Sequence, residues 1–310
     1  MTFFVPHNGQ PTDELVINWH LIEQCNYQCR YCFSKWAAPT STAVIYRSKE
    51  RTTRFLAQLW EAFAPATSSL MSHGRFEWSS VRLSLAGGEA TLLGPRLIDI
   101  CRTATQLGFD VSLISNGSLL TESYTSELAP YLAVLGLSVD STDTVANKTI
   151  GRAQKNGEIL NIDDIANVTT WARRANEDIT VKINTVVSAY NAGEDFTGLL
   201  TCTRPDRWKV LRMLPVISHD GKASDDEFQR FVTRHSRHAS IMSVESNTDM
   251  TQSYVMIDPS GRFFQNTPQD ASYLYSGPIE ELGCNAAFSQ IPFDSSKFLS
   301  RYAPSGSERS

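Results

Sequence analysis

The chain has 310 residues, of which 41% are hydrophobic and 20% charged, enough apolar material for one large core. Its net charge of −5 argues against a nucleic-acid surface, because binding of such a polymer requires a concentrated positive field. No run of about 18 apolar residues predicts a membrane span, and the N-terminal segment lacks the features of a signal peptide. We therefore expect a cytoplasmic protein with neither a membrane nor a nucleic-acid partner.

Along the first 240 residues, short apolar segments alternate with amphipathic ones, the pattern of a parallel α/β fold. Strands are predicted at residues 15–22, 81–86, 110–115, 133–139, 179–187 and 207–214. Helices are predicted at residues 41–64, 94–107, 121–129, 161–176, 192–201 and 225–235. Six such units followed by a different C-terminal pattern predict a partial, open (βα)6 barrel.

The helix at 161–176 carries local signals at both of its ends. Asn161 can cap its first turn, which is acidic, and Arg173 and Arg174 fall in its last turn. These charges are favourable at the two ends of the helix dipole.

From about Ile241 the pattern changes to extended segments separated by turns. Residues 253–258 and 262–265 predict a hairpin whose turn lies at 258–261. We therefore divide the chain into an N-terminal extension (1–14), the barrel (15–240), a hairpin and cap region on its open side (241–302) and a flexible tail (303–310).

Three of the six cysteines, Cys25, Cys29 and Cys32, lie within eight residues. In a chain without a secretory signal, crowded cysteines more often bind metal than form disulfides. Three thiolates on a four-iron cluster leave one iron open, where S-adenosylmethionine (SAM) can bind through its amino and carboxylate groups. Structural zinc is the alternative, but it usually recruits four ligands, and the nearest further candidate is His20.

The spacing C-x-x-x-C-x-x-C resembles the cluster motif of the radical SAM superfamily. In that superfamily a Gly-Gly-Glu stretch ending the second strand receives the SAM amino group, and LSLAGGEA supplies Gly87, Gly88 and Glu89. Glycine lets the backbone approach the ligand, and the carboxylate faces the ammonium group. The resemblance implies a [4Fe–4S] cluster and SAM as cofactors.

Two neighbouring predicted strands carry cations on one face. In ITVKINTVV, Lys182 and Asn184 alternate with apolar residues, and in RWKVLRML, Arg207 and Lys209 share a face. Helices cover the apolar face of a barrel strand, so we expect these side chains inside. Because a buried cation is costly without an anion, and Lys and Arg bind phosphate oxygens well, the pattern indicates a polyphosphate.

Two alternatives explain the same cations without a phosphate. Interior carboxylates such as Asp140 or Glu245 can pair with them, and Arg207 alone is better explained as a strand-end residue in water. For Lys182 together with Lys209 we prefer the polyphosphate.

A closer resemblance, to the viperin family in its prokaryotic form, runs from about Asn18 to Tyr302. It rests on the ordered segments NWHLIEQCNYQCRYCF, LAGGEATLL, LISNGSLL, LSVDS, IGRAQ, VKINTVV, RWKVLRML, VESN and QSYVMID. The resemblance implies conversion of a ribonucleoside triphosphate (CTP, UTP or GTP) to its 3′-deoxy-3′,4′-didehydro analogue, an antiviral chain terminator. The implied course is abstraction of the 4′ hydrogen by a 5′-deoxyadenosyl radical, loss of the 3′-hydroxyl as water, and delivery of one electron and one proton.

The same resemblance implies a role for each matching residue. The SAM pocket would be lined by Gly87, Gly88, Glu89, Ser115, Asn116, Ser138 and Arg152. The nucleotide would be held by Lys182, Asn184, Arg207 and Lys209, with Glu245 and Asn247 closing the pocket. Tyr254 would lie near the ribose and could supply a hydrogen atom or a proton, although a packing aromatic is an equal alternative.

The implied partners are a nucleoside triphosphate and an electron donor of the flavodoxin or ferredoxin type. A radical SAM enzyme acting on a peptide or another small molecule is the main alternative. Such peptide enzymes often carry further cysteine clusters near the C-terminus, and here only Cys284 lies beyond position 202. A non-catalytic binding protein is a further alternative, against which the intact cysteine motif weighs.

Overall fold

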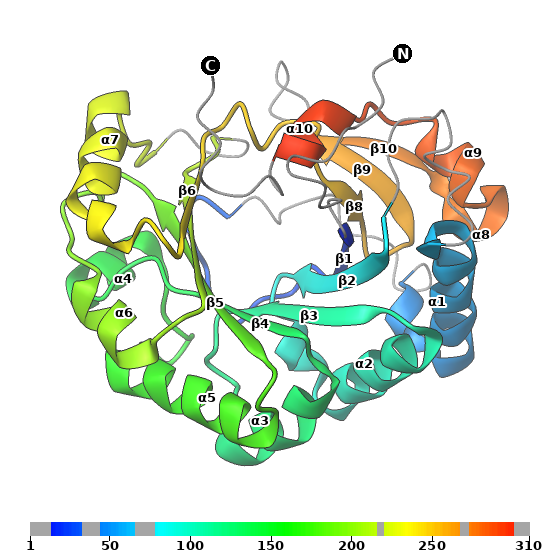
Figure 1. Cartoon of the computed structure of the whole chain (residues 1–310), viewed down its shortest axis with the longest axis horizontal. Helices are drawn as coiled ribbons and strands as arrows, with labels where there is room; N and C mark the ends of the chain where they lie inside the picture. Colours follow the sequence, from blue (N-terminus) through cyan, green and yellow to red (C-terminus); the bar gives the residue numbers. More distant parts are fainter. Residues whose placement is uncertain (1–13, 33–43, 66–77, 216–219, 267–272, 301–310) are drawn as a thin grey trace.

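One curved sheet of ten strands organises the protein (Figure 1). The computed structural model describes residues 14–32, 44–65, 78–215, 220–266 and 273–300. The strands are β1 (Glu14–Ile22), β2 (Ser80–Gly87), β3 (Asp110–Ser115), β4 (Val134–Ser138), β5 (Thr180–Val187), β6 (Arg207–Arg212), β7 (Met242–Glu245), β8 (Val255–Ile257), β9 (Arg262–Asn266) and β10 (Tyr273–Pro278). Their order across the sheet is β10-β9-β8-β1-β2-β3-β4-β5-β6-β7.

The sheet is an open, partial barrel. Strands β1 to β7 pair in chain order and are all parallel, and β8 pairs with the free side of β1, also parallel. β9 and β10 extend that side as antiparallel strands. Within the described residues β7 and β10 are the two edges, which confirms the predicted α/β class and the unclosed sheet.

Most of the described helices cover the outer side of this sheet, as Figure 1 shows. The described helices are α1 (Lys49–Phe63), α2 (Pro95–Leu107), α3 (Glu122–Leu128), α4 (Thr144–Ile150), α5 (Ile162–Ala175), α6 (Thr197–Thr203), α7 (Asp225–Arg234), α8 (Ile279–Leu282), α9 (Cys284–Phe288) and α10 (Ser295–Ser300). None of the helices in the described part of the chain is long and apolar enough to cross a membrane.

The main core lies between the helices and the outer face of the strands. In β5, Val181, Ile183 and Val187 belong to this core, while Lys182 and Asn184 project from the opposite face. The alternation read from the sequence is therefore confirmed. It leaves the inner face of the sheet polar and available for chemistry.

Several predicted elements are confirmed and two helix starts are wrong. Strand 110–115 matches β3, and α5 has the predicted Asn161 cap, completed by Asp164 as a capping box. The helix predicted from residue 41 begins at Lys49, because Ser48 caps it by accepting from the Arg51 amide; residues 33–43 lie outside the described part. The helix predicted from residue 192 begins five residues later.

The turn before α6 explains that second error. The side-chain nitrogen of Asn191 donates to the carbonyl oxygens of Asp140 and Val186, and its side-chain oxygen accepts from the backbone amide of Ser188. These bonds hold residues near 191 in a turn, so the helical pattern starts only at Thr197.

The C-terminal region continues the same sheet at both edges. The predicted hairpin is present as β8 and β9, with the Gly261 amide donating to Asp258 across its turn. Strands β7 and β10, and helix α4, are elements that the sequence pattern did not predict. The division of the chain at residue 240 stays a prediction.

Candidate active site

The cysteine loop follows β1 directly and rests on the C-terminal end of α4. The Gln28 amide donates to Gly151 (3.1 Å) and the Arg30 amide to Ile150 (2.9 Å). Gly151 has φ of 86°, and a Cβ there would lie 2.3 Å from the Gln28 carbonyl oxygen. Only glycine therefore lets the two segments approach this closely.

Nitrogen donors point at two of the three sulfurs. The Tyr27 amide lies 3.3 Å and the Asn116 side-chain nitrogen 3.8 Å from Cys25 Sγ, and Arg152 Nη1 lies 4.0 Å from Cys29 Sγ. Burial raises the pKa of the Cys29 thiol to about 12, and the Arg152 charge opposes that rise. Donors of this kind stabilise sulfur that carries negative charge, as in a metal-bound thiolate.

Asp140 joins these parts from the end of β4. Its Oδ2 accepts from Tyr31 Oη (2.7 Å) and pairs with Arg152 Nη1 (2.8 Å), and its Oδ1 accepts from the Val186 amide (2.8 Å). Arg152 also donates to the Ser138 carbonyl. The carboxylate and the guanidinium are both buried, so each needs the other.

The Gly-Gly-Glu stretch closes against the start of the cysteine loop. A Cβ on Gly88 would lie 2.1 Å from the Gln24 carbonyl oxygen, and the Glu89 amide donates to that oxygen (2.8 Å). Glu89 is buried, and its Oε1 accepts from Thr91 and from Ser115 Oγ (2.8 Å). The glycines thus permit the approach of protein backbone, and Glu89 ties the end of β2 to the end of β3.

Ser115 and Asn116 link β3 to the cysteine loop. Ser115 Oγ also accepts from the Gly117 amide (2.9 Å), and the Asn116 amide donates to Glu89 Oε2 (2.7 Å). The Asn116 side chain bonds Asn26 (2.9 Å) as well as Cys25. Ser115 therefore acts within the protein, whereas Asn116 reaches the sulfur.

The predicted cations occupy successive rows of the inner face. Lys182 pairs in register with Arg207, and Asn184 with Lys209 on one side and Ser138 on the other. Burial first, and then the nearby charge of Lys209, lower the pKa of Lys182 well below its ordinary value. Arg207 is exposed at the start of β6, which agrees with the strand-end alternative for that residue.

Lys209 lies in a bonded group with Glu245 and Tyr254. Its Nζ lies 2.5 Å from Glu245 Oε1 and 3.1 Å from Tyr254 Oη, and Tyr254 donates to Glu245 Oε2 (2.5 Å). In this structure the interior carboxylate of Glu245 is thus paired with Lys209. This agrees with the alternative in which an interior carboxylate, and not a phosphate, is the partner of that lysine. Lys209 lies in β6, Glu245 in β7, and Tyr254 directly before β8. The three side chains therefore join the β6–β7 side of the sheet to the segment that leads into β8.

Two further predicted residues differ in their surroundings. The Asn184 side-chain nitrogen is buried and has no hydrogen-bond partner in the described residues, so it can receive a ligand oxygen. Asn247 lies beyond β7, and with its nitrogen turned toward β6 its amide donates to Arg212 (3.2 Å) and Met213 (3.3 Å). Asn247 therefore holds the strand ends, away from the row of Lys182.

The comparisons with known proteins decide the family. The model of the radical SAM superfamily matches residues 19–188. A protein from Psychrobacter lutiphocae, named S-adenosylmethionine-dependent nucleotide dehydratase, is 38% identical over 96% of this chain and 97% of its own. One from Pseudoalteromonas ulvae with the same name is 39% identical over 93% of each chain, and the RSAD2 form from Danio rerio is 30% identical over 92% of this chain and 76% of its own.

The chain belongs to the S-adenosylmethionine-dependent nucleotide dehydratase family. This is the viperin family that the motifs indicated, within the radical SAM superfamily. Among solved structures, anSMEcpe with bound AdoMet matches with a TM-score of 0.63 at 15% identity, covering 93% of this chain and 82% of that one. At that identity the likeness concerns the fold.

Radical SAM proteins use a [4Fe–4S] cluster and SAM, and the residues of this dehydratase family member fit both. No group of three His, Cys, Asp or Glu side chains in the described ranges is close enough to hold a single metal ion. Three thiols from one loop, two of them with nitrogen donors directed at their sulfurs, are a suitable ligand set for such a cluster. The orphaned Asn184 nitrogen beside the Ser138 row suits a polar ligand such as SAM or the substrate.

Two residues near the candidate site were not predicted as site residues. Asp140 appeared only as a counter-ion candidate, yet it connects Arg152 with Tyr31. Arg82 of β2 lies on the inner face, and the alternation of SVRLSLAG, with Leu83 and Leu85 in the core, was the signal that could have found it.

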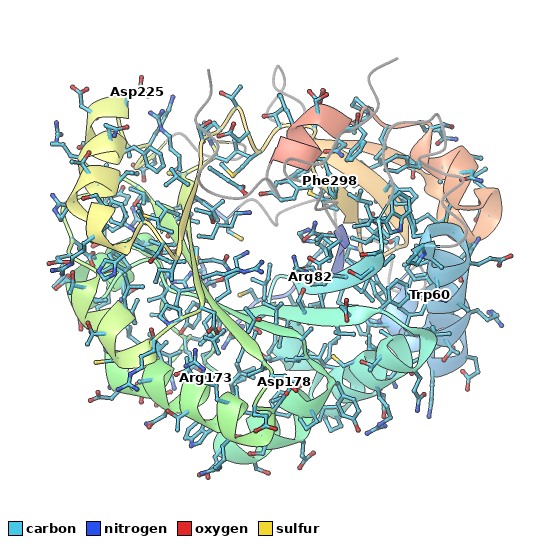
Figure 2. The ribbon with its side chains drawn as sticks, viewed as in Figure 1. Trp60, Arg82, Arg173, Asp178, Asp225 and Phe298 are labelled. Carbon is cyan, nitrogen blue, oxygen red and sulfur yellow. The ribbon has the colours of Figure 1, made fainter. Side chains whose placement is uncertain are left out.

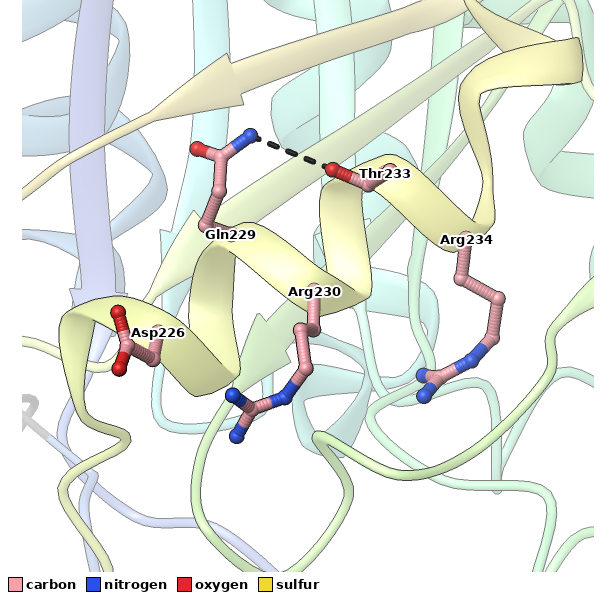
Figure 3. A pocket seen from close by; sticks show the side chains of 5 residues that line it. All are labelled: Asp226, Gln229, Arg230, Thr233 and Arg234. Atoms are coloured by element: carbon pink, nitrogen blue, oxygen red, sulfur yellow. Dashed lines mark hydrogen bonds between the residues drawn. The ribbon is translucent and has the colours of Figure 1, made fainter.

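A hollow of about 400 Å³ lies elsewhere, on the outer helix α7 (Figure 3). Its lining consists of Asp226, Gln229, Arg230, Thr233 and Arg234, all from that one helix. None of these residues belongs to the inner face of the sheet, so the hollow is separate from the candidate site.

Proposed function

We propose that this protein is a radical SAM nucleotide dehydratase that converts a ribonucleoside triphosphate to its 3′-deoxy-3′,4′-didehydro analogue. The observation that carries the proposal is the inner face of β5 and β6, which directs Lys182, Arg207 and Lys209 to one region. It occurs in a chain that matches relatives named nucleotide dehydratases along nearly its whole length. That full-length match also disfavours the peptide-modifying alternative.

The cations bind and orient the phosphates. Lys182 has a lowered pKa because it is buried near other positive charges, and a polyphosphate relieves that repulsion. Lys209 must exchange Glu245 for a phosphate oxygen, since the two are 2.5 Å apart without substrate. Arg207, at the strand start, supplies a further positive charge at the solvent side.

Bound cluster and SAM supply the 5′-deoxyadenosyl radical that abstracts the 4′ hydrogen of the ribose. The protein then controls protons near the sugar. Tyr254 holds its proton on Oη in a 2.5 Å hydrogen bond to Glu245, a position from which it can protonate the 3′-hydroxyl so that this group leaves as water; one electron then completes the didehydro product. Asn184 offers its unused amide hydrogens to a substrate oxygen.

The required electron comes, we propose, from a flavodoxin- or ferredoxin-type donor. The cytoplasm supplies such donors, nucleoside triphosphates and the reducing conditions that keep all of the cysteines free. The didehydro product lacks a 3′-hydroxyl, so it would end the chain of a viral polymerase that incorporates it.

The test measures 5′-deoxyadenosine formed by anaerobically reconstituted protein with dithionite and SAM. One of CTP, UTP, GTP or ATP is expected to accelerate its formation, and mass spectrometry should find the dehydrated nucleotide. If none of the four changes the rate while the cluster spectrum is normal, the nucleotide proposal is wrong.

A Lys182→Ala variant separates the phosphate site from the cluster. The cluster spectrum should be retained, while turnover at low nucleotide falls because the buried cation is lost. Lys148→Ala on α4 is the matched control, and its turnover should equal that of the wild type. Equal turnover in both variants would contradict the role of Lys182.

A further inference from the structure

A closed ring of side-chain hydrogen bonds joins the cysteine loop to the segment that follows β3. The Asn116 side-chain nitrogen donates to Asn26 Oδ1 (2.9 Å), and the Asn26 side-chain nitrogen donates to Ser118 Oγ (2.7 Å). Ser118 Oγ completes the ring by donating to Asn116 Oδ1 (2.6 Å). Each of the three side chains therefore donates once and accepts once within the ring.

The backbone decides how the Asn116 amide is turned. Its Oδ1 also accepts from the Ser118 backbone amide (2.9 Å), which can only donate, so the oxygen faces Ser118 and the nitrogen faces away. Gly117 between them has φ of 83°, a left-handed conformation that glycine adopts readily. The Asn116 backbone amide donates to Glu89 Oε2 (2.7 Å), and Glu89 follows β2, the strand on which Figure 2 labels Arg82. Asn116 is thus fixed in both its main chain and its side chain.

The fixed nitrogen also faces a cysteine sulfur. It lies 3.8 Å from Cys25 Sγ, and the Tyr27 backbone amide lies 3.3 Å from the same sulfur. The Cys25 thiol in turn contacts Asn26 Oδ1 at 3.9 Å, a contact that ends when the sulfur becomes a metal-bound thiolate. The two N–H groups do not depend on that contact, because one belongs to the backbone and the other is held by the ring.

Hydrogen bonds to ligand sulfurs are among the factors that set the reduction potential of an iron–sulfur cluster. One electron converts the [4Fe–4S]2+ state to the [4Fe–4S]+ state and adds negative charge, part of which the ligand sulfurs carry. An N–H group directed at such a sulfur stabilises the reduced state more than the oxidised state, so it raises the potential. Its effect depends on how firmly the surrounding side chains hold it in that direction.

We propose that Asn116 is a positioning residue for the cluster, held by Asn26 and Ser118 so that its side-chain N–H group raises the reduction potential. The cluster is then easier to reduce, and that reduction precedes the cleavage of SAM. Ser118 acts through Asn116 rather than on the sulfur. This inference rests on the cofactor of the family and not on the proposed nucleotide substrate.

A redox titration followed by electron paramagnetic resonance tests the inference, with anaerobically reconstituted protein and neither SAM nor nucleotide. At a fixed potential, Asn116→Ala should show an about tenfold lower ratio of reduced to oxidised cluster, which is a downward shift of about 59 mV for one electron. Asn116→Asp should lie lower still, since an oxygen replaces the N–H group beside the sulfur. Asn156→Ala is the matched control, because this exposed asparagine bonds the Glu158 amide (3.1 Å), and its potential should match that of the wild type.

Ser118→Ala separates the ring from the donor itself. It keeps both N–H groups near Cys25 but opens the ring, so the potential should fall in the same direction by a smaller amount. An unchanged potential in Ser118→Ala, or in Asn116→Ala with its full iron content, would overturn the inference. If Asn116→Ala binds no iron, Ser118→Ala alone decides. No nucleotide enters this titration, so its failure leaves the proposed function standing, and a negative nucleotide screen leaves this inference standing.

Discussion

The most informative single change is Asp140→Asn, which removes one charge from a buried pair and alters little else. The side chain of Asp140 is 3% exposed and that of Arg152 9%, and their ion pair measures 2.8 Å. Removal of one partner leaves the other charge uncompensated in the interior, which typically costs about 3–5 kcal/mol. The substitution also replaces the charged acceptor of the Tyr31 hydrogen bond with a neutral amide. The free energy of unfolding should therefore fall by at least the lower end of that range.

Urea unfolding of the cluster-free protein, followed by circular dichroism at pH 7, measures this loss. Asp99→Asn is the matched control, because Asp99 pairs with Arg102 at 2.6 Å while both side chains are nearly half exposed. Its loss should stay below about 1 kcal/mol. If Asp140→Asn costs no more than Asp99→Asn, the reasoning that burial makes Asp140 a structural centre of the site is refuted.

Three further predictions concern the same site. Because the free-protein pKa of Lys182 is lowered, triphosphate affinity should be greatest below that pKa and fall as the pH rises through it, with proton uptake visible by calorimetry in buffers of different ionisation enthalpy. Gly88→Ala should disrupt the loop, since a Cβ there lies 2.1 Å from a carbonyl oxygen, whereas Gly193→Ala, with nothing within 4 Å, should retain the wild-type melting temperature. Tyr31→Phe should lower the unfolding free energy by about 1 kcal/mol, measured by urea unfolding, and an unchanged value would remove the Tyr31 hydroxyl from the Asp140 group.

Most of the fold, and the residues at the centre of the candidate site, could be predicted from strand periodicity and local motifs. The alternation in β5 placed Lys182 and Asn184 correctly on the inner face, because a strand has only two faces and apolar residues mark one of them. The capping signals of Asn161 worked for a similar reason, since a cap acts within one turn of chain. The cysteine spacing and the Gly-Gly-Glu stretch are equally local.

Contacts between distant segments were beyond the reach of these patterns. Nothing near Asp140 in the chain shows that Tyr31, 109 residues away, donates to it. The short helix α4 lacks a long periodic pattern, yet it supports the cysteine loop through Gly151. The pairing of Lys209 with Glu245 also requires that β6 and β7 are neighbours in the sheet. The sequence pattern did not predict β7, so it did not predict this pairing.

The placement of charge along the strands gives the site a direction. The thiols, Gly88 and Asp140 follow the carboxyl ends of β1, β2 and β4, where loops of a parallel sheet gather. Arg82 and Lys182 are each the third residue of their strand, and with a rise of about 3.3 Å per residue they lie on the order of 15 Å below those ends. On the proposed function, phosphates bound at this depth leave the sugar between them and the thiols, beside Tyr254 and Asn184. A nucleotide held the other way would put its most charged part against the cysteine loop, whose thiolates repel it, so the same arrangement that binds the phosphates also selects the atom that the radical meets.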